Sequence, residues 1–287
     1  MYNHLMTWFW LAIISIISVS LASVLQRKLM KREESDPVSY SIVFQFILTV
    51  LTGAFALIKG FHPPILQGYI VNYILAGVLW GGMSLLSFKA LQTIGAGEMT
   101  IITSSSVMIT IIVSVLFLGE IFGYTKILGT VLILGAIILL YGKKKFHWTN
   151  GIIFAFGAAI CTGFALANDA YILKGGYDAI SYVPIICFLP GIFIMLIQPR
   201  AILNIPKMIH PSVMKNMALF SGFYALQAIT YYIALERGAN AGQLSTMTKS
   251  SIILTVIFAA ILLKERNDLG KKILSAIFAT IAVLLLR

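Results

Sequence analysis

The sequence predicts an all-α membrane protein in which ten transmembrane helices form two inverted five-helix repeats. Of the 287 residues, 59% are hydrophobic and 11% are charged, whereas a soluble domain carries about 25% charged residues. Apolar runs of about 20 residues, enough to cross roughly 30 Å of hydrocarbon, recur along the whole chain. The sequence of residues 97–141 is also repeated, with substitutions, at residues 242–286.

The individual spans follow from these apolar runs and from the turn signals between them. We expect helices at 7–25, 39–58, 70–91, 97–118, 123–141, 151–173, 179–197, 214–236, 241–263 and 269–286. The connections are short and rich in charged residues, glycine or proline, and no stretch remains for a soluble domain. Trp8 and Trp10 are expected to anchor a retained first helix at the membrane interface.

The internal repeat divides one membrane domain into residues 1–142 and 148–287. An offset of 145 aligns identical residues: Gly97 with Gly242, Ser105 with Ser250, Ser106 with Ser251, Glu120 with Glu265, and Lys126 with Lys271. The segment Asp36–Tyr40 likewise matches Asp178–Tyr182 at an offset of 142. Because five is an odd number of helices, the second half must enter the membrane in the opposite orientation.

Each half also has a charged corner between two long apolar helices, Leu118-Gly119-Glu120 and Leu263-Lys264-Glu265. With these corners and the repeat, essentially the whole chain resembles the drug/metabolite transporter superfamily, EamA type. The resemblance implies a ten-helix carrier with a central cavity that exports small metabolites or toxic compounds across the inner membrane of a prokaryotic cell. Family members often have a proline near the middle of helices 4 and 9, where this chain has Val107 and Ile252. A kink there does not follow from the resemblance.

Two indications of membrane orientation disagree. Most lysines and arginines lie in the connections after helices 1, 5, 7 and 9, so the positive-inside rule places both termini outside. The family resemblance implies that both termini lie inside. The sequence leaves this question open.

Lys249 is the strongest candidate for a substrate-binding residue. It lies about nine residues into its predicted span, about 13 Å deep at 1.5 Å per residue, where its stem does not reach either interface. Ser245 lies on the same helical face, which favours a polar cavity over lipid. The ammonium group would attract a substrate carboxylate or exchange a proton. A structural lysine bonded to helix-end carbonyls is the alternative.

The carboxylates have competing interpretations. Glu98 is a candidate counter-charge, substrate contact or coupling site, but the first turn of a helix stabilises a carboxylate anyway. Asp169 is either a gate or coupling site or one partner of an interfacial ion pair with Lys174. The corner residues Glu120 and Glu265 are expected to cap the helix that follows each corner.

Two helix faces are candidates for the wall of the substrate cavity. Tyr224, Gln227 and Tyr231 follow one another at helical spacing in the eighth span. In the third span, Trp80, Ser84 and Ser87 form the corresponding face, and Trp80 is the one tryptophan away from an interface. Sites in inverted-repeat carriers form at mid-depth between the halves, so both faces are expected to line the cavity, although aromatic stripes also serve packing.

These observations favour a secondary carrier with a small-molecule substrate, either driven by protons or by the substrate gradient. The cavity residues suit a zwitterion or small anion such as an amino acid. The chain has no phosphate-binding loop for ATP, and its basic residues sit in short loops rather than on a face for nucleic acid. A channel, a membrane assembly factor and an intramembrane enzyme remain alternatives.

No cofactor and no metal site are expected, because the four histidines are scattered through loops at no ligand spacing. The two cysteines, Cys161 and Cys187, fall inside predicted helices and are expected to be free. The protein would contact membrane lipid and function as a monomer or homodimer.

Overall fold

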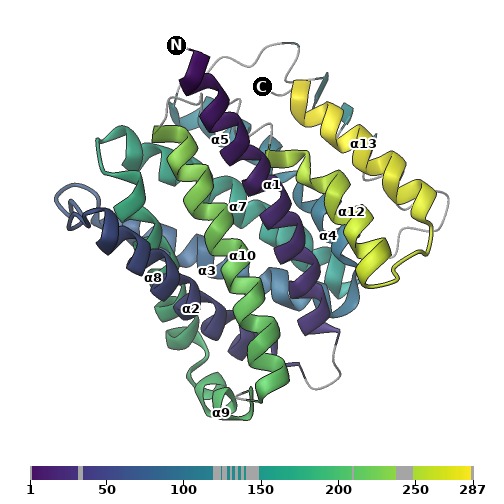
Figure 1. Cartoon of the computed structure of the whole chain (residues 1–287), viewed down its shortest axis with the longest axis horizontal. Helices are drawn as coiled ribbons and strands as arrows, with labels where there is room; N and C mark the ends of the chain where they lie inside the picture. Colours follow the sequence, from purple (N-terminus) through teal and green to yellow (C-terminus); the bar gives the residue numbers. More distant parts are fainter. Residues whose placement is uncertain are drawn as a thin grey trace.

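A computed structural model describes residues 2–31, 35–118, 149–208, 210–236 and 248–285, with scattered positions between 124 and 139, as a helical bundle (Figure 1). Its helices are α1 (Tyr2–Met30), α2 (Pro37–Lys59), α3 (Ile70–Thr93), α4 (Ala96–Thr103), α5 (Ser106–Leu118), α7 (Asn150–Lys174), α8 (Ala179–Ile197), η1 (Pro199–Asn204), α9 (Ile205–Met208), α10 (Pro211–Glu236), α12 (Ser251–Leu262) and α13 (Leu269–Leu285).

The all-α membrane class is confirmed, but ten spans are not. Within the described residues six helices are long and apolar enough to cross a membrane: α1, α2, α3, α7, α8 and α10. Helices α5, α12 and α13 have 13, 12 and 17 residues. The predicted span 123–141 lies mostly outside the described residues.

The matching segments Asp36–Tyr40 and Asp178–Tyr182 each begin a helix. The Asp36 carboxylate accepts a hydrogen bond from the Val38 amide at the start of α2. Asp178 accepts one from the Ser181 amide at the start of α8. Aspartate at this position satisfies amides that have no partner within the helix, so the repeated segment is a repeated helix start.

Two helices are interrupted at positions that the repeat aligns. The predicted span 97–118 is divided at Ser104 and Ser105, and α5 begins at Ser106. In the second half a turn at Ser250 precedes α12, which begins at Ser251. Paired serines loosen a helix because their hydroxyls bond backbone carbonyls in place of the regular ladder. The interruption therefore occurs without the proline that family members often carry.

The helices pack in pairs that join residues far apart in the sequence. The main contacts are α1 with α10, α2 with α8, α3 with α7, and α3 with α8. In Figure 1, α1 and α10 run side by side across the face of the bundle. Between the first two pairs, Phe44 of α2 stacks on Phe220 of α10 with ring centroids 4.4 Å apart.

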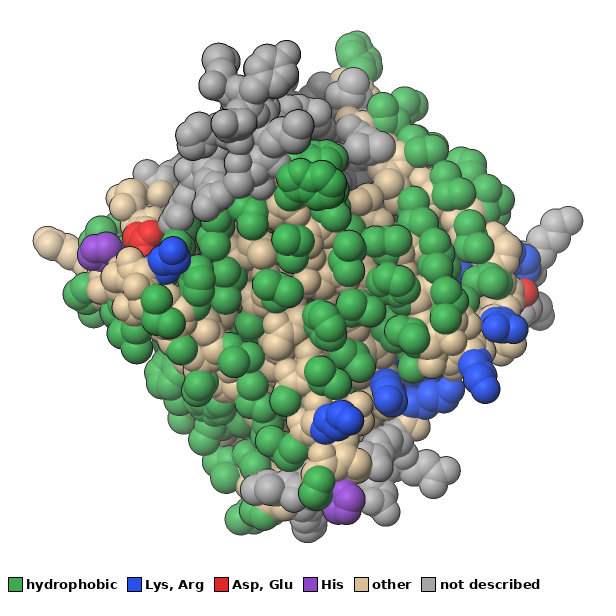
Figure 2. All heavy atoms as spheres, viewed as in Figure 1, with side chains coloured by type: hydrophobic (Ala, Val, Ile, Leu, Met, Phe, Trp, Pro, Cys, Tyr) green, Lys and Arg blue, Asp and Glu red, His purple; other side chains and the backbone are tan. Residues whose placement is uncertain are grey.

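Side-chain contacts place the connections at two opposite ends. At one end Asn204 donates a hydrogen bond to Asp36, and Arg27 pairs with Glu265. At the other end the His62 amide donates to the Ser181 hydroxyl. Figure 2 shows lysines and arginines gathered along one edge, where α1 and α12 end, and hydrophobic side chains over the broad face beside it. We call this edge the basic end.

Candidate functional site

The centre of the bundle contains two adjoining cavities of about 190 and 270 Å³. They share part of their walls, including Val19, Phe44, Met83 and Lys249. The first is lined by many serine and threonine side chains, and the second by aromatic and aliphatic ones. We call them the hydroxyl lobe and the aromatic lobe, and together the central chamber.

Lys249 lies where the two lobes meet, on the short helical segment that precedes the Ser250 turn. It is the only charged side chain among the described residues that line either lobe. Within the described residues, no ion pair involves Lys249. Its side chain therefore contacts an internal cavity, as the sequence suggested, while Ser245 lies outside the described residues.

The two predicted helix faces meet in the aromatic lobe. Trp80 of α3 and Tyr224, Gln227 and Tyr231 of α10 all line it. Tyr224 also reaches the hydroxyl lobe. Four of the residues singled out from helical spacing thus share one cavity with Lys249.

Sequence reasoning missed the part of the hydroxyl lobe that residues 100–106 form. Ser84 and Ser87, on the predicted face of α3, lie in its wall, and so do Thr100, Thr103, Ser104 and Ser106. The signal was a run of hydroxyl residues from position 100 to 106 inside an otherwise apolar stretch. Because small hydroxyl residues also occur in ordinary helix packing, their number alone did not identify a cavity.

Asp169 has neutral partners. Its carboxylate accepts hydrogen bonds from the Trp80 indole at 3.0 Å and the Tyr182 hydroxyl at 2.7 Å. It is 4% exposed and lies behind Trp80, outside the lining of either lobe. The expected ion pair with Lys174 is not testable, because that side chain is outside the described residues.

Glu98 is in the first turn of α4, as expected, but it is not among the residues lining either lobe. Its neighbours Met99 and Thr100 are lining residues of the hydroxyl lobe. Glu98 interacts with other residues of the protein. The structure thus separates it from the group of predicted residues that share the chamber.

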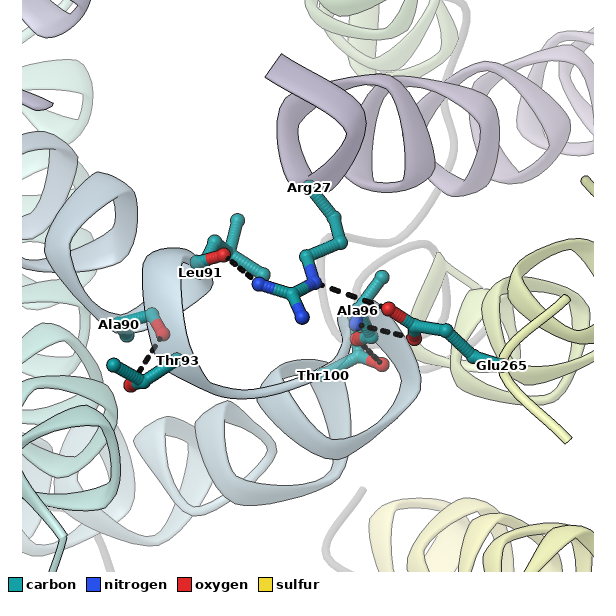
Figure 3. A network of polar contacts seen from close by, with 7 residues as sticks. All are labelled: Arg27, Ala90, Leu91, Thr93, Ala96, Thr100 and Glu265. Atoms are coloured by element: carbon teal, nitrogen blue, oxygen red, sulfur yellow. Dashed lines mark hydrogen bonds and ion pairs between the residues drawn. The ribbon is translucent and has the colours of Figure 1, made fainter. Parts of the chain in front are cut away.

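A polar network lies behind the wall of the hydroxyl lobe at the basic end (Figure 3). Arg27 of α1 pairs with Glu265 at 3.0 Å and donates a second hydrogen bond to the Leu91 carbonyl. Glu265 also accepts from the Ala96 amide, the first of α4, at 3.2 Å. Leu91 and Ala96 themselves line the hydroxyl lobe, so the ion pair lies directly behind its wall.

The prediction that Glu265 caps the helix after its own corner was wrong. It satisfies an amide of α4, from the other half of the chain. The close approach depends on Gly95, since a Cβ there would lie 2.6 Å from the Glu265 carboxylate. The helix terminus attracts the carboxylate through its unpaired amides, but the tertiary packing decides which helix is capped. Glu120, the equivalent residue, lies outside the described residues.

The described part of the chain contains no group of three or more His, Cys, Asp and Glu side chains able to hold a metal ion. Cys161 and Cys187 are free thiols. Cys187 lines the aromatic lobe among apolar neighbours. The arrangement is therefore suited to binding through one ammonium group, hydroxyls and aromatic surface.

Comparisons with known proteins concern the family and the fold. Residues 6–142 match the model of the EamA-like transporter family. A solved structure described only as a crystal structure of a protein superposes with a TM-score of 0.62, over 96% of this chain and 99% of that chain, at 14% identity. At that identity the likeness concerns the fold alone. No curated protein matches the sequence.

Proposed function

Through residues 6–142 this chain belongs to the EamA-like transporter family, and we propose that it is a secondary active transporter that exports a small metabolite or drug-like solute. Family membership points to a multi-pass membrane transporter rather than an enzyme. We assign it to the inner membrane of a prokaryotic cell. The central chamber is the substrate site in this proposal, and the two halves expose it alternately to the two sides.

The alternating mechanism requires two inverted five-helix repeats, 1–142 and 148–287. The packing of the described helices supports this division. Under the repeat, α1 corresponds to α7 and α3 to α10, so the contact of α1 with α10 is the counterpart of α7 with α3. Helices α5 and α12 also begin at the aligned residues Ser106 and Ser251.

The substrate contacts in this proposal are Lys249, Trp80, Tyr224, Gln227 and Tyr231. All five line the chamber, which is the observation that carries the assignment of the site. Ser245 remains a further proposed contact, because it is expected on the same helical face as Lys249.

Coupling is a separate part of the proposal. Asp169 is the stronger candidate for a proton-coupling residue, because its carboxylate is bonded to the chamber residue Trp80. Binding of a proton would weaken the hydrogen bond that holds the indole. We keep Glu98 as the second candidate.

The network of Arg27 and Glu265 is the gate at the basic end. The two side chains are 12% and 11% exposed, so they are held between helices rather than in solvent. They connect α1 and α4 to the corner between α12 and α13, which belong to opposite halves. A rocking motion of the halves would separate them and open the chamber at this end.

Chamber access tests the proposal. Cys161 and Cys187 are replaced by alanine, Ser251→Cys is introduced into the wall shared by both lobes, and the full-length protein is reconstituted in liposomes. We expect an impermeant maleimide to label this cysteine from each side, more slowly than Lys28→Cys or His62→Cys at the two ends. Labelling from one side only would refute alternating exposure, and fast labelling from both sides with ionic current would indicate a channel.

The matched control is Leu116→Cys, on a side chain that is 72% exposed on the outside of the bundle. This position is expected to face lipid and to remain unlabelled from either side. Labelling there would mean that the reagent reaches the hydrophobic surface. Labelling of Ser251→Cys would then no longer report access to the chamber.

A further inference from the structure

We infer that the cargo is an amphipathic organic anion, a carboxylate attached to an aromatic or bulky apolar group and lacking an ammonium group. The inference rests on the proposed transport function and specifies the chemical class that the same chamber takes. It departs from the zwitterionic amino acid that the sequence suggested. Three features of the chamber wall support it.

The first feature is the isolated positive charge. Lys249 stands where the lobes meet, and no described lining residue carries a negative charge. An ammonium group away from water is costly unless an anion accompanies it. In a transport cycle the substrate itself would supply this anion.

The second feature is a pair of unused hydroxyl donors in the wall of the hydroxyl lobe, which Lys249 also lines. Ser84 and Ser106 are 1% and 0% exposed, and their hydroxyl oxygens have no hydrogen-bond partner among the described residues. By contrast, Thr103 and Ser104 donate to carbonyls of their own helix at 2.9 and 2.6 Å. A carboxylate in the hydroxyl lobe would accept from the two serines and from Lys249, and it would satisfy groups that are otherwise costly to bury.

The third feature is the character of the aromatic lobe. Its wall consists mainly of aromatic and aliphatic side chains, among them Trp80, Tyr224 and Tyr231. The indole N–H of Trp80 already bonds Asp169, so the ring offers its apolar surface. This lobe therefore suits an aromatic or branched hydrocarbon group adjoining the carboxylate.

The wall offers no described carboxylate to an ammonium group on the substrate. Asp169 bonds the lining residue Trp80, but both of its oxygens accept hydrogen bonds already. Transfer of an amino acid into the chamber would strip water from its ammonium group without a matching charge. Removing that group from the ligand should therefore strengthen binding.

Equilibrium binding to the purified full-length protein at neutral pH tests the inference with four probes that share a phenylethyl group. These are 3-phenylpropionate, phenylalanine, phenethylamine and the neutral 3-phenylpropionamide. We expect 3-phenylpropionate to bind at least about ten-fold more tightly than each of the others, the gain of a charge-assisted hydrogen bond. Equal or tighter binding of phenylalanine or phenethylamine would overturn the inference.

Variants locate the charge that recognises the anion. Lys249→Gln should weaken 3-phenylpropionate by about 10–100-fold and leave the weak binding of the amide unchanged. Unchanged amide binding also reports that the variant is folded. If Lys249→Gln does not fold, Ser106→Ala removes only a hydroxyl and should weaken the anion by about five-fold or more. Unaltered anion affinity in the folded variant would overturn the inference.

Lys89→Gln is the matched control. This lysine is half-buried, with its ammonium group 5.7 Å from the centre of the Phe154 ring, but it does not line either lobe. It should leave all four affinities unchanged. If none of the probes binds a protein whose Ser251→Cys variant is labelled from both sides, the substrate class is wrong while the transport mechanism stands.

Discussion

The gate predicts that Glu265→Gln opens the chamber toward the basic end. Glutamine keeps an acceptor for the Ala96 amide, so the helix remains capped, but the charge opposite Arg27 is removed. Breaking a buried ion pair by removing one charge costs about 3–5 kcal/mol. Because Arg27 keeps its hydrogen bond to the Leu91 carbonyl, we take the stability lost by the closed state as about 2 kcal/mol. This is the value for a hydrogen bond to a charged group.

A loss of about 2 kcal/mol from the closed state corresponds to a shift of about 30-fold toward the state open at this end. The assay is the maleimide labelling rate of Ser251→Cys from the basic end, divided by the rate from the other end. We expect this ratio to rise by up to about 30-fold in Glu265→Gln. Arg27→Gln should raise it similarly, and the double variant should rise by less than the product of the two, because both changes remove one interaction.

Asp268→Asn is the matched control in the same corner. Asp268 and Lys271 are 3.8 Å apart and both 45% exposed, an arrangement in which solvent screens the interaction. The labelling ratio should not change in this variant. An unchanged ratio in Glu265→Gln, together with a lower melting temperature, would refute the gate and leave the ion pair with a purely structural role.

Three further predictions follow from single contacts. Trp80→Phe removes a donor from the buried Asp169, so the melting temperature should fall by the equivalent of about 1–3 kcal/mol, and unchanged stability would contradict the bond's importance. Gly95→Ala should displace the Glu265 carboxylate and raise the labelling ratio as Glu265→Gln does; no rise would mean that the gate is not held by this approach. Burial raises the pKa of Asp178, but hydrogen bonds from the first turn of α8 outweigh burial and hold the pKa below 3.8. Its contribution is therefore present above pH 3.8 and lost as pH falls through the folded-state pKa, so Asp178→Ala should cost about 1 kcal/mol at neutral pH and progressively less under acid, as measured by thermal unfolding.

The chamber shows which parts of a membrane protein the sequence predicts. Lys249 was identified because a charge deep in an apolar run requires an explanation, whatever surrounds it. The faces that carry Trp80 and that carry Tyr224 and Tyr231 were predicted from helical spacing. This spacing applies in the structure because α3 and α10 are unbroken helices. These arguments depend on one helix at a time.

The interactions between helices were not predicted. Ala96 is 169 residues from Glu265 in the sequence, and Trp80 is 89 residues from Asp169. The sequence gave no reason to prefer these partners over nearer groups. The part of the hydroxyl lobe formed by residues 100–106 was missed for a related reason. Ser106 resembles a packing serine until the space beside it is known.

The two helix starts at Asp36 and Asp178 have a consequence for how the chain assembles. Each aspartate also contacts the opposite half, Asp36 through Asn204 and Asp178 through the ring of His62. Polar groups at these helix starts have partners in the other half, so one half synthesised alone would lack those partners. A gene divided between codons 145 and 146 should yield two inactive fragments that recover function only when they are made together.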